Sequence, residues 1–439
     1  MSNQAVGSEA TNKEPELKLG RGKAYFWFSV LTVIYWFDIA DRSAINAVFP
    51  AIKQEYGLSD TQLGLLISAF SVVAAGLAPP TAWLVDRWSR KYMIAIMTAV
   101  WSFFTWFTGQ VNSFRWLLFA RSGVGAAEAG YNAGGAALIS AWFPQKIRGR
   151  MFGIFNMAQP LGSFLGMGLA GLLAVKFGWR SAFGILALPG LLLAVLILFA
   201  PDYKATKVDE TGVKEVRPGI REVLRYTIHS PTLLLSYLAY AFSSAWYLGG
   251  YMTWTPTFFG RVYNMDMAEA GLVVVYIGLV AMIGPFLGGW FSDHLVKRTP
   301  NGRAWAGAVF MILSLIAWIF ALVLAMQKAD VLVVGGLWAL GYLFMSGSWG
   351  MSTTIRAELS PPHFRGSVAG ITGLVVLPFG IIMGPLSGAL SDALGLTNAL
   401  LIILVVFEGL TVLCFLAMAW LYHRDVAKLK ALGVFELRQ

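Results

Sequence analysis

The sequence has few of the residues on which soluble enzymes depend. Only 13% of its 439 residues are charged, and it contains one cysteine and four histidines. The single cysteine, Cys414, excludes intrachain disulfides and thiolate metal clusters. The histidines are isolated from one another along the chain, so we expect no metal site and no catalytic cluster. The predicted protein is therefore not an enzyme and carries no cofactor.

Hydrophobic residues are abundant instead, at 57% of the chain, and the mean hydropathy is +0.65. This composition is too apolar for a soluble globular protein. Most apolar stretches reach the ~20 residues that a helix needs to cross a bilayer, and they lack the alternation of barrel strands. The first 23 residues are polar and contain no signal-peptide core, so the first apolar stretch is expected to remain as a span.

The hydrophobic stretches predict an all-α polytopic membrane protein with twelve transmembrane helices. The predicted spans are 24–50, 62–85, 92–111, 115–143, 151–175, 179–200, 231–259, 270–292, 304–326, 330–355, 367–391 and 396–422. A charged interruption divides them six and six. The predicted parts are a tail (1–23), a six-helix bundle (24–200), a linker (201–230), a second six-helix bundle (231–422) and a second tail (423–439). The linker is either a solvated loop or includes a short surface helix over 218–226.

The net charge of +10 is distributed unevenly between the two sides of the predicted topology. Of the 33 lysines and arginines, 25 fall on the side that holds both termini and six on the other side. This asymmetry is typical of the positive-inside rule, which predicts a cell (inner) membrane protein with both termini in the cytoplasm. The basic charge is then explained by topology and does not indicate nucleic-acid binding.

The fourth predicted span contains two charged residues. Arg121 and Glu128 are seven residues apart, two helical turns, and therefore share one face, on which Gly125 leaves space. Ionisable residues inside a membrane are costly and usually line a cavity or an ion pathway. The alternative is a structural ion pair that holds helices together.

The first predicted span also contains charges, at Asp38, Asp41 and Arg42, whose spacings put them on overlapping faces. With Arg121 and Glu128, the group has three acidic and two basic side chains, so it favours proton uptake when an anion binds. Counting residues from the predicted span ends places the arginines in one layer and Asp38 with Glu128 in a deeper layer. We therefore predict proton coupling through Asp38, Asp41 and Glu128. Arg42 is predicted to grip a substrate carboxylate, while Arg121 mainly organises the acidic groups.

The two halves of the chain repeat each other at equivalent loops. Asp86 precedes Arg90 and Lys91 by four and five residues, as Asp293 precedes Lys297 and Arg298. A second pattern, P-x-x-x-R-G, recurs after spans four and ten, at Pro144 to Gly149 and at Pro361 to Gly366. A parallel repeat of six spans is the plan of a secondary transporter with its site between the halves.

At these residues the whole chain resembles the major facilitator superfamily, whose loop signature is G-x-x-x-D-R-x-G-R-K. Here Ala82 and Ser89 stand where glycine is usual. The resemblance implies a cytoplasmic gate that locks the outward-open state. The predicted gate residues are Asp86, Arg87, Arg90, Lys91, Arg148, Asp293, Lys297, Arg298 and Arg365. The alternative is that these are ordinary loop charges that set the topology.

Further polar and aromatic residues are candidates for substrate contacts. The spacings i, i+4, i+7 join Tyr247, Tyr251 and Trp254 in span seven, and Tyr342, Ser346 and Trp349 in span ten; Asn156 and Gln159 share a face in span five. Such stripes otherwise serve packing. In the family that the chain resembles, helices one, four, seven and ten line the cavity, which favours contact with substrate.

Within the superfamily, the chain most resembles the anion:cation symporters of sugar acids and aromatic acids. The matching residues are Asp41-Arg42, Arg121 with Glu128, Gln159 and the segment Ser346 to Trp349. The resemblance implies that the Asp and Glu are protonated, that the first-span Arg binds a carboxylate, and that the Gln, Ser and Trp contact substrate. The chain departs from that family at Ala44, where Asn is frequent, and in having Asp38 as an additional acid.

A competing resemblance is to spinster-like transporters of lysophospholipids, carried by the segment from Asp38 to Phe70, by GVGAAEAG in span four and by YMTWTPTFFGR in span seven. Those proteins share the same charges, while Gln159 and the Ser346/Trp349 pair favour a small polar anion. A membrane receptor without transport activity would not need the gate motif in both halves. The expected protein is a monomeric proton-coupled symporter whose partners are a small organic anion, a proton and the lipid bilayer.

Overall fold

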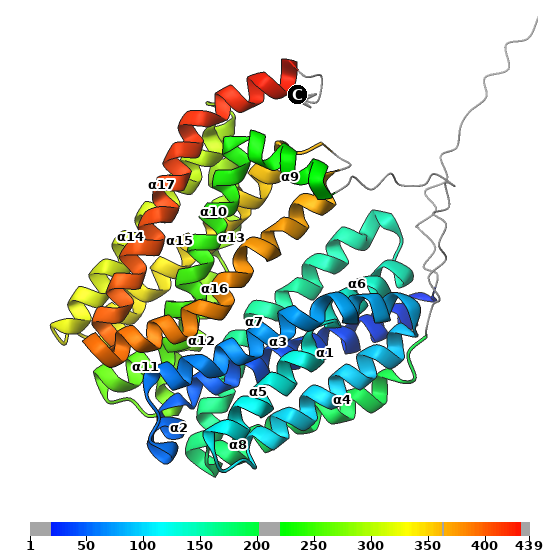
Figure 1. The fold of residues 1–439 in the computed structure, drawn as a ribbon, viewed down its shortest axis with the longest axis vertical. Coiled ribbons are helices and arrows are strands. Elements are labelled where there is room, and N and C mark those ends of the chain that lie inside the picture. Colours follow the sequence, from blue (N-terminus) through cyan, green and yellow to red (C-terminus); the bar gives the residue numbers. More distant parts are fainter. Residues whose placement is uncertain (1–18, 202–219, 362–363, 432–439) are drawn as a thin grey trace, which may run out of the picture.

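The computed structural model describes residues 19–201, 220–361 and 364–431, and within them every regular element is helical. The first bundle, the N-half, comprises α1 (Arg21–Ala47), α2 (Phe49–Tyr56), α3 (Asp60–Arg87), α4 (Arg90–Thr108), α5 (Phe114–Glu128), α6 (Tyr131–Trp142), α7 (Gln145–Phe177) and α8 (Trp179–Ile197). Figure 1 shows these helices, from dark blue to green-cyan, packed beside a second bundle. Parts of the predicted tails and linker, at 1–18, 202–219 and 432–439, lie outside the described residues.

The second bundle, the C-half, follows a short helix, α9 (Ile220–His229), which confirms a helix in the linker region. It comprises α10 (Pro231–Trp246), the π-helical turn η1 (Tyr247–Tyr251), α11 (Met252–Tyr263), α12 (Met267–Ala281), α13 (Gly284–Val296), α14 (Gly302–Met326), α15 (Val331–Glu358), α16 (Arg365–Leu394) and α17 (Leu396–Ala431). Each predicted span corresponds to one helix or to consecutive helices. The fourth span is divided between α5 and α6, and the eighth between α12 and α13.

The helices are suited to a bilayer. Eight helical segments among the described residues are long and apolar enough to cross a membrane by length and composition. The large apolar side chains that are most exposed include Leu332, Phe286, Phe199, Leu192 and Trp290, at 70–81% of full exposure. Such a surface would be an aggregation hazard in water but is the normal surface of a protein in lipid.

The two halves touch mainly along α3 with α16 and along α7 with α12. Glycines allow backbone contact in both places. A Cβ atom added at Gly64 would lie 2.1 Å from the backbone oxygen of Gly384, and one added at Gly171 would lie 2.1 Å from that of Met267. No side chain therefore fits at these two crossings, and the helices approach as closely as their backbones permit.

The bundles approach each other at one end and diverge at the other. We call the end where α1 begins and α17 finishes the terminal side, and the opposite end, near α2 and α11, the distal side. In Figure 1 the ribbons of the two halves cross near α2, α3 and α11 and spread apart toward the terminal side, where α6 and α9 lie. The polar centre described below lies between the halves.

Candidate functional site

Helix α1 supplies the charged residues on which the site is built. Asp38 and Arg42 are one turn apart and line the same cavity between the halves. Asp41 is fully buried, lines neither of the two central cavities, and lies near Trp101 and Thr105 of α4, while both of its carboxyl oxygens have no hydrogen-bond partner. Sequence spacing puts all three charges on overlapping faces of α1. In the structure, Asp38 and Arg42 line the cavity, whereas Asp41 is packed away from it.

The larger central cavity has a volume of about 400 Å³ and contains the acidic part of the site. Asp38, Arg42 and Glu128 line it together with Gln159, and α16 contributes the opposite wall. The residues from α16 are small or aliphatic: Gly373, Val376, Leu377 and Gly380. The charge in this cavity thus belongs to the N-half.

A smaller cavity of about 90 Å³ adjoins the arginine part of the site. Arg42 and Arg121 both line it, and Gln159 is shared with the larger cavity. Asn46 of α1 and Thr253 of α11 add polar groups from the two halves. Arg121 therefore lines only the smaller cavity, Asp38 and Glu128 line only the larger one, and Arg42 lines both.

Both guanidinium groups lie against one aromatic ring. The Arg42 guanidinium carbon is 4.5 Å from the centre of the Phe70 ring, and that of Arg121 is 5.8 Å from it. Gly125 makes this arrangement possible, because a Cβ atom there would lie 2.4 Å from the backbone oxygen of Phe70. The glycine lets α3 approach α5 and place Phe70 against the arginines. Cation–π attraction then holds both guanidinium groups without occupying their N–H donors.

Arg121 retains unused hydrogen-bond donors. Its Nη2 donates to the backbone oxygen of Arg42 at 3.2 Å, while its Nε and Nη1 are buried without a hydrogen-bond partner. In the part of the chain that the structure describes, neither Arg42 nor Arg121 forms an ion pair within 4 Å. Arg121 interacts with Glu128 only over a longer range. The predicted organising role of Arg121 is therefore not exerted through a close ion pair with Glu128 in this structure.

The carboxyl groups of Asp38 and Glu128 are similarly short of partners. Oδ1 of Asp38 and Oε1 of Glu128 are buried and have no hydrogen-bond partner, and the two side chains interact electrostatically with each other. Tyr131 lies beyond them, and its hydroxyl donates to the backbone oxygen of Leu31 at 2.7 Å. Two carboxylates so placed in a low-dielectric site repel each other, so together they form a site suited to holding a proton.

The C-half contributes aromatic side chains next to the small cavity. Tyr247 lines this cavity and stacks on Tyr251 with ring centres 5.8 Å apart. Tyr251 in turn stacks on Tyr342 at 4.4 Å. The Trp349 ring contacts Tyr247 edge-on at 5.1 Å, and its Nε1 donates to Ser243. The predicted stripe in span seven thus reaches the cavity through Tyr247, while Tyr251 and Trp349 support it from behind.

Several predicted substrate contacts lie outside the two cavities in this structure. Trp254 is fully buried and donates to the Ser387 hydroxyl at 2.7 Å. Ser346 is hydrogen-bonded to backbone oxygens of Ala281 and Leu343. Asn156 is exposed but lines neither cavity, whereas Gln159, one turn further along α7, lines both. Of these, only Gln159 has the position of a substrate contact here.

Sequence reasoning missed Phe70, Tyr35, Tyr131 and Thr253 as cavity residues. Tyr35 and Tyr131 could have been found, because they lie three residues from Asp38 and Glu128 and therefore on the same helical faces. Phe70 and Thr253 carried no such signal. Their positions depend on how α3 and α11 pack against the charged helices.

The predicted gate residues lie at the terminal side, and their described contacts stay within one half. Arg148 donates to the backbone oxygens of Ser140 and Phe143 at the end of α6. Asp293 pairs with Arg303 at 2.8 Å, and Arg303 also pairs with Glu358 at 2.6 Å. Arg303 was not predicted, although it follows the second motif by a few residues.

Among the remaining gate residues, Arg87 lies 4.0 Å from the centre of the Trp83 ring and Lys91 lies 5.2 Å from that of Tyr92, both within the N-half. The others are placed by their helices. Arg87 ends α3, Arg90 and Lys91 begin α4, and Lys297 and Arg298 follow α13. The side chains of Asp86 and Arg365 lie outside the described residues. A gate between the halves therefore remains a prediction.

Within the described residues, no group of three or more His, Cys, Asp or Glu residues could hold a metal ion.

The chain is similar to known proteins along most of its length. The chain is 26% identical over 382 residues to the hexuronate transporter of Bacillus subtilis (strain 168), covering 85% of this chain and 90% of that protein. It is 27% identical over 418 residues to protein spinster homolog 3 of Danio rerio, covering 90% and 83%.

A solved structure has the same fold. The inward-facing, unoccupied crystal structure of a bacterial homolog of the human lysosomal transporter spinster matches with a TM-score of 0.81 at 22% identity, covering 93% of this chain and 99% of that one. The family model described as Major Facilitator Superfamily matches residues 31–376. This protein is therefore a multi-pass membrane transporter, not an enzyme, and the chain belongs to the Major Facilitator Superfamily.

Proposed function

We propose that this transporter is a proton-coupled symporter of small organic anions. The observation that supports this most strongly is the pair of arginines beside the small cavity, with unused donors on Arg121 and no close carboxylate partner among the described residues. A guanidinium whose donors are free can bind a carboxylate through two parallel hydrogen bonds. A carboxylate between Arg42 and Arg121 would supply the missing partners.

The acidic pair provides the coupling. With both Asp38 and Glu128 ionised, an incoming anion would meet net negative charge in a low-dielectric cavity. A proton shared by these two carboxyl groups reduces that charge and favours binding of the anion at the arginines. Release of the substrate restores the repulsion and favours release of the proton. Asp41, behind Arg121, helps to balance the buried positive charge.

The relatives support a carboxylate substrate. A hexuronate, the substrate named for the Bacillus subtilis relative, carries a carboxylate and several hydroxyl groups. Gln159, Asn46 and Thr253 are polar groups around the cavities that could hydrogen-bond such hydroxyls. We take the substrate class to be small hydroxylated or aromatic acids.

The distribution of basic residues supports an orientation. The side with 25 lysines and arginines includes both termini, so we assign the terminal side to the cytoplasm and the distal side to the exterior of a cell membrane. One polypeptide contains both halves and the complete cavity, so a monomer suffices for the transport cycle. Substrate then reaches the site alternately from the two sides.

The proposal is tested by uptake of a radiolabelled hexuronate into proteoliposomes under an imposed proton gradient. We expect accumulation with the parent protein and none with Glu128→Gln, because the variant cannot exchange the proton. Substrate counterflow, which needs no net proton movement, should survive in Glu128→Gln. Asp38→Asn should impair accumulation in the same way.

Glu408 offers a matched control. It is a buried carboxyl group in α17 with no hydrogen-bond partner, and it lines neither central cavity. Glu408→Gln should therefore keep gradient-driven uptake if the protein folds. Undiminished accumulation in both Glu128→Gln and Asp38→Asn would show that protons move elsewhere. Saturable binding of a lysophospholipid, without binding of hexuronates, would favour the spinster-like alternative.

A further inference from the structure

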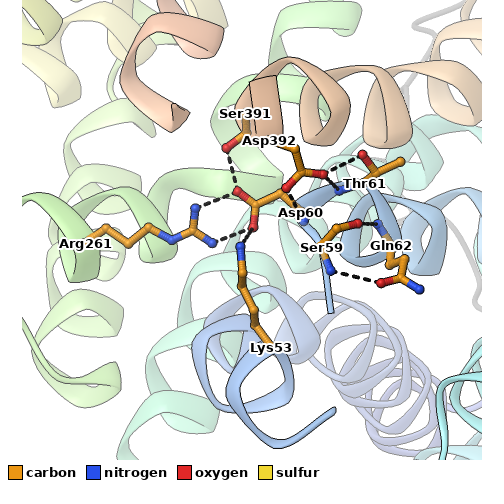
Figure 2. Close-up of polar contacts among 8 residues, drawn as sticks. All are labelled: Lys53, Ser59, Asp60, Thr61, Gln62, Arg261, Ser391 and Asp392. Carbon is orange, nitrogen blue, oxygen red and sulfur yellow. Dashed lines mark hydrogen bonds and ion pairs between the residues drawn. The ribbon is translucent and has the colours of Figure 1, made fainter. Parts of the chain in front are cut away.

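A second polar cluster lies far from the central site, at the distal side. Asp60 is the first residue of α3 in the N-half, and Lys53 precedes it in α2. Arg261 lies in the last turn of α11, and Ser391 and Asp392 lie near the end of α16, all in the C-half. Figure 2 shows these side chains converging on Asp60 from different elements.

The carboxylate of Asp60 accepts four hydrogen bonds from side chains. Arg261 grips it through both terminal nitrogens, with Nη1 to Oδ2 and Nη2 to Oδ1 each at 2.6 Å. Lys53 Nζ donates to Oδ1 and Ser391 Oγ donates to Oδ2, again at 2.6 Å. The Asp60 side chain is 3% exposed, whereas those of Arg261 and Lys53 are 33% and 36% exposed. The carboxylate is thus the buried centre, and its basic partners reach it from the water-exposed edge.

A second carboxylate crosses in the opposite direction. Asp392 of the C-half accepts hydrogen bonds from the backbone nitrogens of Asp60 and Thr61, at 2.8 and 2.9 Å, and from the Thr61 hydroxyl at 2.7 Å. These nitrogens belong to the first turn of α3, where a negative charge is stabilised by the free N–H groups and the helix dipole. Each half therefore binds a carboxylate of the other half: Asp60 is bound by a C-half arginine, and Asp392 caps an N-half helix.

Opening the distal side would break both sets of carboxylate contacts between the halves. Moving α3 away from α11 and α16 would separate Asp60 from Arg261 and Ser391, and would also remove Asp392 from the start of α3. Lys53 would remain with Asp60, since both belong to the N-half. Breaking a buried bidentate pair leaves charge without its partner and is therefore costly. The cluster favours the arrangement in which the distal side is closed.

We propose that Asp60, Arg261 and Asp392 form a distal latch that closes the outer side of the transporter and sets the balance between its two open states. This inference depends on the alternating access proposed above but not on the identity of the substrate. The latch lies at the opposite end from the predicted gate of Asp86 and its neighbours. The two charged clusters would then stabilise opposite states of one cycle.

The test measures conformation rather than uptake, so it remains decisive whatever the protein transports. Spin labels on exposed loop residues Gln110 and Gln327 report the distal side, and labels on Gln145 and Thr299 report the terminal side. In Asp60→Asn and in Arg261→Gln, we expect the population with a long distal distance to rise about tenfold relative to the parent. The terminal distance should shorten in the same samples.

Further variants separate a latch from a merely structural contact. Arg261→Lys keeps the charge but loses the two-pronged grip, so its shift should be smaller than that of Arg261→Gln. The double variant Asp60→Asn/Arg261→Gln should shift no further than about the larger single variant, because both remove one interaction.

Glu55→Gln is the matched control. Glu55 pairs with Arg180 at 2.6 Å on the same side of the protein, but both residues belong to the N-half. Its distance distributions should equal those of the parent. Unchanged distributions in Asp60→Asn and Arg261→Gln would overturn the proposal. Broadening at both ends together would overturn it too, because the cluster would then maintain the fold rather than select a state.

Discussion

At the scale of single residues, the central site depends on two arginines that are charged but have no close carboxylate partner among the described residues. Arg42 lines both cavities and Arg121 lines the smaller one, and Phe70 supports both guanidinium groups. The aromatic ring attracts the cations without using their N–H groups as a carboxylate would. The protein therefore keeps two cations in a membrane while leaving donors free for a ligand.

Replacing either arginine by lysine should weaken substrate binding. Arg42→Lys and Arg121→Lys keep the charge but lose the planar fork, so affinity for a carboxylate should fall by roughly 1–3 kcal/mol. Isothermal titration or scintillation proximity binding with a hexuronate measures this directly. Ser346→Ala is the control, since the Ser346 hydroxyl is occupied by backbone oxygens outside the cavities. Parent-like affinity in Arg42→Lys would place the carboxylate contact elsewhere.

At the scale of elements, short helices at the distal side tie the long ones together. Helix α2 carries Glu55, whose Oε2 accepts from Trp179 Nε1 and whose Oε1 accepts from Arg180 Nη2, each at 2.6 Å. Both donors lie in the first turn of α8. Partial burial of Glu55 opposes its ionisation, but the hydrogen bonds from Trp179 and Arg180 outweigh this and hold its pKa below the ordinary value.

This lowered pKa predicts a pH-dependent contribution to stability. A carboxyl group whose pKa is lower in the folded state stabilises the fold above its ordinary pKa of about 4.3, and the contribution is lost as the pH falls through the folded value. Glu55→Gln should therefore lower thermal stability at pH 7, by less than about 1 kcal/mol because the pair is partly exposed. The difference from the parent should shrink toward pH 3. A constant difference across this range in a thermal-shift titration would contradict the assignment.

At the scale of the whole molecule, the closed distal side depends on backbone contact as well as on charge. α3 and α16 cross where Gly64 faces Gly384, and a Cβ atom at Gly64 would lie 2.1 Å from the Gly384 backbone oxygen. The obstacle is backbone rather than a flexible side chain, so the helices would have to separate. The crossing depends on glycines of both helices, since a Cβ atom at Gly384 would lie 2.6 Å from the Gly64 backbone oxygen and one at Gly388 would lie 2.3 Å from that of Asp60.

Gly64→Ala should disfavour the closed distal side. Overpacking of this kind costs roughly 1–3 kcal/mol, which would be relieved by separating the halves. Electron paramagnetic resonance distances across the distal side should lengthen in this variant. Gly76→Ala is the control on the same helix, because a Cβ atom there meets nothing within 4 Å. Equal distances in the two variants would show that the crossing tolerates a side chain.

The sequence by itself determined the class of protein and the location of the charges. Runs of apolar residues long enough for a bilayer predict helices, since every backbone polar group in lipid must be satisfied within the helix. The repeat of Asp86 and its basic residues at Asp293 predicts two equivalent halves. The spacing of Arg121 and Glu128 predicts one polar face, because residues seven apart on a helix always share a face.

Only the tertiary structure decided which of these residues face a cavity and which are packed. Helical spacing cannot distinguish Asp41 from Asp38, because both fall on overlapping faces; the packing of α4 against α1 buries Asp41. The distal latch was likewise invisible, since Asp60 and Arg261 are 201 residues apart and lie at helix ends whose local sequence does not indicate that they meet. Local periodicity fixes the face of a helix, whereas the partner of that face depends on contacts between segments far apart in the chain.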